Sequence, residues 1–122
     1  MFKKAYTVRR HGKQTANGGY AGAPYSDIPM MLNIQPLSPD EMQALPEGDR
    51  TVRRVKSFGS GRMAPADEFD GVPGDRLFYQ GLWHECVSSA TWDHTPLGHY
   101  RSEFVLLPPH EQEEPPEGGA GP

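Results

Sequence analysis

The chain has 122 residues, the size of a single domain, and its 35% hydrophobic content leaves room for only one core. No run approaches the roughly 20 apolar residues that a membrane span needs, and the first six residues lack the apolar stretch of a secretion signal. The single cysteine, Cys86, excludes an internal disulfide framework. We therefore expect a small soluble protein that is made in the cytosol.

The charge is distributed unevenly along the chain. Residues 1–66 carry ten Lys/Arg and five Asp/Glu, net +5, whereas residues 67–122 carry two and eleven, net -9, which sums to the net charge of -4. Opposite charges on two faces would help to orient copies that pack head to tail. The alternative is two solvated surfaces whose charges are screened by salt.

Period-two alternation predicts two strands near the N-terminus. In residues 2–9, Phe2, Tyr6 and Val8 share one side, and a second strand is predicted over residues 29–35, which Pro36 ends.

The segment between these strands, residues 11–27, is rich in Gly, Asn, Ala and Pro and shows no periodicity. It predicts a long flexible loop. Long loops in small domains are often binding loops, and aromatic rings make good interface contacts. We therefore interpret Tyr20 and Tyr25 as contacts to a partner.

A helix-start signature follows the second strand. Ser38 can cap the helix, Pro39 suits the first helical position, and Glu41 completes a capping box. Pro46 and Gly48 end the helix after about two turns, which is too short for stability without packing on a sheet.

The second half of the chain predicts strands again. Residues 50–58 are β-branched and basic, which favours a strand exposed on one side, and residues 59–71 predict a second flexible loop. Residues 75–87 predict a hairpin that turns at Gly81.

A connection over residues 91–98 then leads to a last strand over residues 100–106. Residues 110–122 contain no aliphatic residue larger than Ala and predict a disordered acidic tail. The organisation is one β-rich domain over residues 1–109, a small barrel or sandwich with one short helix, followed by that tail.

Two stretches resemble a known family: residues 34–51, and residues 74–100 with the hairpin pattern Asp-Arg-hydrophobic-x-Tyr-x-Gly-x-Trp from Asp75 to Trp83 and the later pair Trp92-Asp93. They are similar to the small head-tail joining proteins of tailed bacteriophages, also called head closure, head completion or stopper proteins. The resemblance spans about residues 28–107.

The resemblance implies a small β-barrel or sandwich in the virion, at the head-tail junction. It would form a ring of about six or twelve copies between the portal or adaptor protein and the tail terminator or tail tube protein, closing the DNA-filled head. The acidic tail and residues 11–27 depart from a minimal member, which leaves open the level of the neck: adaptor, stopper or tail terminator.

Basic residues are the remaining interface candidates. They could line a passage for DNA or contact a protein partner, and the acidic chain favours the protein, with DNA nearby but not specifically bound. An alternative function is a monomeric β-barrel binding module for a peptide or nucleic acid. The candidates are Arg9, Arg10, Arg53, Arg54 and Arg62, with Lys56 beside them.

Catalytic and metal chemistry have weaker signals. Structural zinc sites usually show two close-spaced ligand pairs, and one cysteine cannot supply them. We therefore favour ordinary packing or surface positions for the metal-ligand types within residues 84–99 and expect no metal or cofactor. Cys86 and a histidine could form a nucleophile and base, but the sequence shows no oxyanion-binding motif to accompany them. The segment Gly59–Arg62 lacks the Gly-Lys-Ser/Thr of a P-loop, so we expect that the protein is not an enzyme. The metal-ligand types are His84, Cys86, Asp93, His94 and His99.

Overall fold

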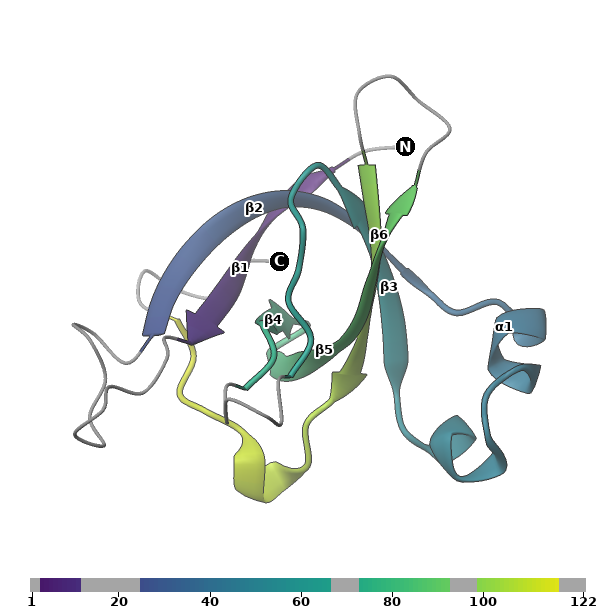
Figure 1. The fold of residues 1–122 in the computed structure, drawn as a ribbon. Coiled ribbons are helices and arrows are strands. Elements are labelled where there is room, and N and C mark those ends of the chain that lie inside the picture. Colours follow the sequence, from purple (N-terminus) through teal and green to yellow (C-terminus); the bar gives the residue numbers. More distant parts are fainter. Residues whose placement is uncertain (1–2, 12–24, 67–72, 93–98, 117–122) are drawn as a thin grey trace, which may run out of the picture.

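Six antiparallel strands close into a barrel in the computed structural model, which describes residues 3–11, 25–66, 73–92 and 99–116 (Figure 1). The strand order around the barrel is β1-β2-β3-β6-β5-β4, and β4 pairs with β1 to close it. The predicted mainly β fold is therefore confirmed, as a barrel. Its elements are β1 (Lys4–His11), β2 (Tyr25–Pro36), α1 (Pro39–Gln43), η1 (Glu47–Thr51), β3 (Arg54–Gly59), β4 (Arg76–Tyr79), β5 (Leu82–Trp92), β6 (His99–Leu106) and η2 (Pro109–Glu111).

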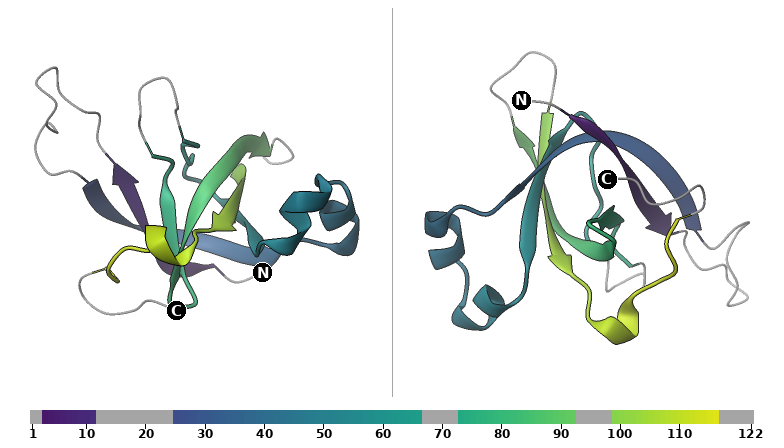
Figure 2. Two further views of the ribbon diagram at one scale, coloured as in Figure 1. Left: turned by 90° about the horizontal axis from the view of Figure 1, so that it is seen from below. Right: turned by 180° about the vertical axis from the view of Figure 1, so that it is seen from behind.

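Strand β2 is long enough to serve two neighbours. Its first part pairs with β1, from His11↔Tyr25 to Lys4↔Leu32, and its last four residues pair with β3, starting at Asn33↔Phe58. Figure 2 shows β2 curving around the barrel between these two partners. The barrel is closed at the other side by the short pairing Val8↔Leu77 between β1 and β4.

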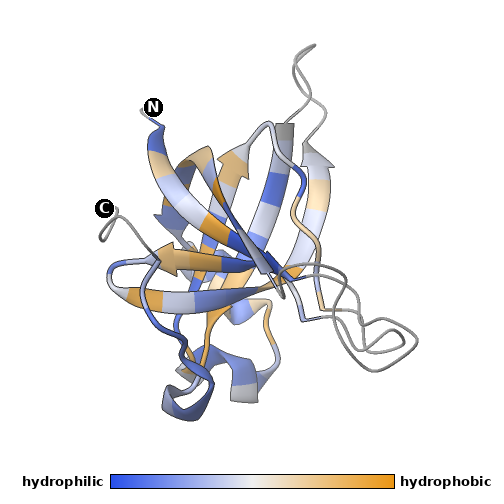
Figure 3. Ribbon diagram, turned by 90° about the vertical axis from the view of Figure 1, so that its left-hand side faces the viewer, coloured by the Kyte–Doolittle hydropathy of each residue, from blue (hydrophilic) through white to orange (hydrophobic). Residues whose placement is uncertain are grey.

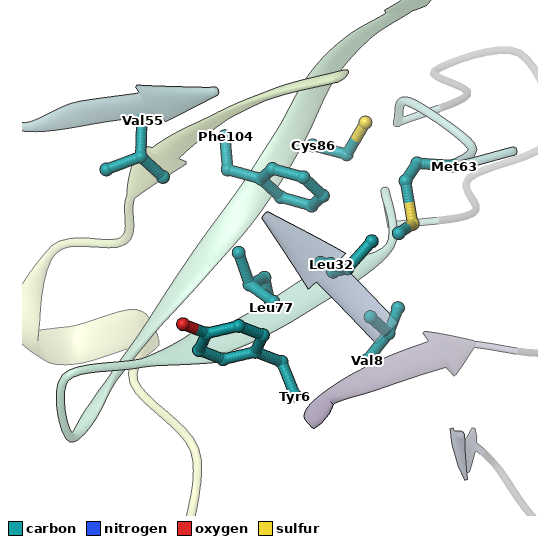
Figure 4. Packing of buried hydrophobic residues seen from close by; sticks show 8 residues of the cluster. All are labelled: Tyr6, Val8, Leu32, Val55, Met63, Leu77, Cys86 and Phe104. Carbon is teal, nitrogen blue, oxygen red and sulfur yellow. The ribbon is translucent and has the colours of Figure 1, made fainter. Parts of the chain in front are cut away.

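The barrel interior is filled by side chains, as expected for a small barrel. Alternate residues of the strands point inward, and Figure 4 shows their side chains converging from β1, β2, β3, β4, β5 and β6. Met63 enters the same core from the segment after β3. The core cluster comprises Tyr6, Val8, Leu32, Val55, Met63, Leu77, Cys86 and Phe104.

Strand β2 starts earlier than the sequence predicts. The predicted loop over residues 11–27 is wrong at both ends, because His11 belongs to β1 and residues 25–27 belong to β2. Ser26, Asp27 and Pro29 hide the alternation in the sequence, but the ladder with β1 continues through them. Residues 12–24 lie outside the described part of the chain.

The strand predicted over residues 50–58 is also shorter than expected. Residues 47–51 form the 3-10 helix η1, and β3 begins at Arg54. The Arg50 guanidinium donates to the carbonyls of Leu45 and Gln43, so it stabilises a compact turn instead of an extended strand.

Helix α1 has the predicted capping box: Ser38 accepts from the Glu41 backbone N–H, and the Glu41 carboxylate accepts from the Ser38 backbone N–H. The helix is shorter than the predicted two turns, ending at Gln43, and none of its residues is fully buried, although Met42 is half-buried. Glu41 holds the helix to the barrel through ion pairs with Lys56 on β3 and Arg101 on β6.

The hairpin of β4 and β5 is confirmed, with Tyr79↔Leu82 as its last pair. Gln80 and Gly81 both have positive φ, 53° and 80°, as a two-residue hairpin turn with the twist of the strands requires. Trp92 lies in β5, not in the predicted connection, because the β5–β6 ladder extends to Trp92↔His99. Figure 3 shows hydrophilic and hydrophobic residues alternating along the strand ribbons.

The acidic segment is ordered at its start. Residues 108–116, which we call the C-terminal strap, turn at η2 below the barrel and rise towards the end of β1 (Figure 1). The segment predicted as a disordered tail therefore includes residues 110–116, which the structure describes against the barrel, and residues 117–122, which lie outside the described part. No helix within the described ranges is long and apolar enough to cross a membrane.

Candidate interaction surfaces

Arg9 was expected on an interface, but the structure buries it. Strand alternation places it on the outer face of β1, where it is only 3% exposed. Its guanidinium lies between two rings, 3.9 Å from the centroid of Tyr25 and 4.5 Å from that of Trp83. It also donates two hydrogen bonds to the Asp27 carboxylate, at 2.8 and 3.0 Å, and these bonds raise the pKa of Arg9.

Arg10 is also engaged within the chain. Its guanidinium binds the buried Asp75 carboxylate, with the shortest N–O distance at 2.9 Å, and donates to the carbonyl of Arg62. Asp75 in turn accepts from the backbone N–H of Ala64. Asp75 therefore fastens the segment after β3 onto β1.

The other predicted basic residues divide into two groups. Arg54 pairs with Glu103 across the β3–β6 ladder, at 3.3 Å. Arg53 donates to Gln80 and lies 5.3 Å from the centroid of the Tyr79 ring, and Arg62 is exposed. Arg62 thus keeps the most accessible position among the arginine candidates, whereas Arg53 is half-buried.

The predicted tyrosines have different outcomes. Tyr25 is 38% exposed, but it belongs to β2 and packs against Arg9 and His11. Tyr25 is therefore part of the barrel wall and not of the loop predicted over residues 11–27. Tyr20 lies outside the described residues.

The folded barrel brings the two oppositely charged halves of the chain together. Ion pairs across the halves join Arg10 to Asp75, Arg54 to Glu103 and Arg101 to Glu41. Charges that pair inside one copy are less available to orient a neighbour, so the charge asymmetry of the sequence does not translate directly into two opposed faces.

The strap covers the outer face of β1, β4 and β5. Beneath the strap lies a second hydrophobic cluster of Phe78, Trp83 and Leu107, separate from the barrel interior. Phe78 and Trp83 face each other across the hairpin, with ring centroids 5.0 Å apart. We call this surface, together with Arg9 and Arg76 beside it, the Trp83 groove.

Gln112 is the best-placed residue of the strap. Its side-chain oxygen accepts from the backbone N–H of Trp83 at 2.8 Å, and its side-chain nitrogen donates to the carbonyls of Trp83 and Leu107 at 3.0 and 2.9 Å. Trp83 lies just past the last β5–β6 pair, His84↔Leu106. The Leu107 N–H donates to the Trp83 carbonyl at 3.1 Å, and the carboxamide bridges the remaining Trp83 N–H and Leu107 carbonyl.

Glu113 meets three basic side chains at the edge of the groove. Its carboxylate lies 3.0 Å from Arg76, 3.5 Å from His11 and 3.8 Å from Arg9. The next residue, Glu114, accepts a hydrogen bond from the Trp83 indole through its backbone carbonyl, at 3.1 Å. Sequence reasoning missed these contacts because a Glu- and Pro-rich segment has the composition of a disordered tail.

The metal-ligand candidates are not brought together in the described residues. His84 and Cys86 both point into the barrel and are 0% and 1% exposed, and no group of three His, Cys, Asp or Glu side chains in the described ranges is arranged to hold an ion. Asp93 and His94 lie outside the described residues, as does the side chain of His99.

Burial controls the chemistry of both groups. It lowers the pKa of His84 to about 4, and the positive charge of Arg53 adds to this effect. Burial and, to a lesser extent, the Asp75 carboxylate raise the pKa of the Cys86 thiol to about 12. A thiol with so high a pKa is a poor nucleophile at neutral pH.

An apolar surface lies beside the end of β6. Two adjacent depressions, of about 490 and 250 Å³, share Leu106, Leu107 and Pro109. Val52 and Leu82, 40% and 39% exposed, extend the apolar lining on either side. We call this the β6-end surface.

Comparison of the sequence with models of known protein families finds no match, and no curated protein has a significantly similar sequence.

Proposed function

We propose that this chain is a structural protein of a tailed-phage neck, which forms a ring between the portal or adaptor and the tail, closes the filled head and docks the tail. The proposal comes from the resemblance of residues 34–51 and 74–100 to head-tail joining proteins, for which the resemblance implies a small β-barrel or sandwich. The confirmed barrel agrees with the fold that this resemblance implies.

The filled barrel is the observation that carries the proposal. A barrel that binds a ligand inside needs an internal cavity, whereas here the interior is occupied by side chains such as Phe104, Leu77 and Met63, all with no exposed surface. Contact with other molecules therefore has to occur on the outer surface, which favours an assembly role over a small-molecule role.

The β6-end surface supports contact between copies. It combines exposed Val52 and Leu82 with the apolar depressions, and apolar surfaces of this kind are typical of protein interfaces. Arg53 at its edge supplies a donor for a polar rim.

Light scattering combined with electron microscopy of the purified chain tests the proposal, with and without a portal ring as template. We expect rings of about six or twelve copies, weakened by Val52→Asp. The matched control is Val87→Asp, because Val87 is similarly exposed, at 42%, but lies away from the β6-end surface. A chain that stays monomeric in both conditions and binds a peptide or nucleic acid would instead support the binding-module alternative.

A further inference from the structure

We propose that the Trp83 groove is a peptide-binding site for residues 112–116 of a second copy, and that the strap seen against its own barrel fills the same site within one copy. The inference deepens the proposed function, on which it rests, by naming one contact between neighbouring subunits. The occupant is a Gln-Glu-Glu-Pro-Pro segment.

The groove is a built site. Phe78 and Trp83 form an aromatic floor that is 3% and 0% exposed. The Arg9 guanidinium is held beside this floor by Asp27 and the two flanking rings, so its position is fixed independently of the strap. Arg76 on β4 adds a second cation, which Glu85 on β5 also contacts at 3.4 Å.

The strap is recognised in the way that a free peptide would be. Three consecutive residues make the polar contacts: the Gln112 carboxamide, the Glu113 carboxylate and the Glu114 backbone carbonyl. These contacts depend on the local sequence and not on the covalent connection to β6. The acidic peptide also complements the cationic edge of the groove.

The connection between barrel and strap permits exchange. Residues 108–111 are all exposed, and η2 has no buried residue, so little packing holds this connection in place between β6 and residues 112–116. An exchanged strap remakes the same contacts in the neighbour, which makes exchange of an identical segment a low-cost route to association. In a ring, the neighbouring groove is present at high effective concentration.

A labelled peptide of residues 109–116 tests the site on full-length chains by fluorescence anisotropy. Glu113→Lys places a cation against Arg76 and displaces the chain's own strap, so we expect the wild-type peptide to bind this variant at least tenfold more tightly than it binds the wild-type chain. The matched control is Glu114→Lys, because the Glu114 side chain is exposed and only its backbone carbonyl contacts the groove.

Absence of peptide binding to a folded Glu113→Lys chain overturns the proposal, and circular dichroism establishes that the chain is folded. If that variant does not fold, Gln112→Ala opens the same groove without reversing a charge and gives the same readout. A peptide that itself carries Lys at position 113 should bind at least tenfold more weakly than the wild-type peptide.

Exchange between copies is tested by mixing Glu113→Lys with Arg76→Glu chains. Each variant places like charges together within its own copy, whereas in a mixed complex every strap meets a groove of opposite charge. Native mass spectrometry should show more mixed complexes than complexes formed by either variant alone. If mixed complexes are no more abundant than those, exchange is overturned.

The two proposals fail separately. Wild-type rings without peptide binding would leave the proposed function standing and refute the role of the Trp83 groove. Peptide binding and mixed complexes without any ring would refute the neck assembly and keep the groove.

Discussion

The contribution of Gln112 to stability can be worked out from its contacts. Gln112→Ala removes three hydrogen bonds to the backbone of Trp83 and Leu107. A typical hydrogen bond contributes about 1 kcal/mol net, and a buried donor left without a partner costs about 1–3 kcal/mol. Because water can reach part of the opened groove, we expect a loss of about 2–3 kcal/mol in the free energy of unfolding.

Urea unfolding followed by circular dichroism measures this loss. Gln43→Ala is the matched control, because Gln43 ends α1 on the exposed surface and the same substitution there should change stability by less than about 0.5 kcal/mol. If Gln112→Ala unfolds within 0.5 kcal/mol of wild type, the strap is not held by the carboxamide, and the recognition argument for the Trp83 groove loses its main contact.

Three further predictions concern the barrel itself. The unfolded chain binds a proton at His84 near pH 6.5 and the folded chain only near pH 4, so stability is fully present above pH 6.5 and falls as the pH drops from 6.5 to 4. The loss approaches roughly 3 kcal/mol, and His84→Gln should flatten the acid limb of a stability-pH curve; an unchanged limb would contradict the burial of a neutral imidazole. Gly74→Ala should cost about 1–3 kcal/mol in urea unfolding, because its Cβ would lie 2.7 Å from the Ala66 nitrogen and 2.8 Å from the Cys86 carbonyl oxygen, whereas Gly48→Ala, with no atom within 4 Å, should be nearly neutral. The Cys86 thiol, with its pKa raised to about 12 by burial, should react with a thiol reagent at pH 8 only as fast as the barrel opens; a reaction as rapid as that of urea-unfolded protein would place the thiol at the surface.

The strands that are buried on one face only were predictable from the sequence. Tyr6 and Val8 in β1, and Leu32 in β2, alternate with polar or exposed neighbours, so the period-two pattern identifies them. The hairpin turn at Gln80 and Gly81 was also predictable, because the φ values of such a turn favour glycine.

Elements fixed by tertiary contacts were not predictable in the same way. The start of β2 depends on its ladder with β1, and the turn of η1 depends on the Arg50 guanidinium reaching back to Gln43 and Leu45. Neither contact leaves a periodic signal. The basic residues were recognised as important, but the carboxylates of Asp27 and Asp75, which bind Arg9 and Arg10, lie 18 and 65 positions away in sequence.

The closed barrel limits the order in which its strands can pair during folding. The pairing of β3 with β6 and that of β1 with β4 form only after the second half of the chain is present, because β6 and β4 belong to that half. When the chain is synthesised from its N-terminus, the basic half is complete before its acidic counterpart exists. Docking of the two halves is then a late collapse assisted by attraction between opposite charges, so refolding should slow as ionic strength rises.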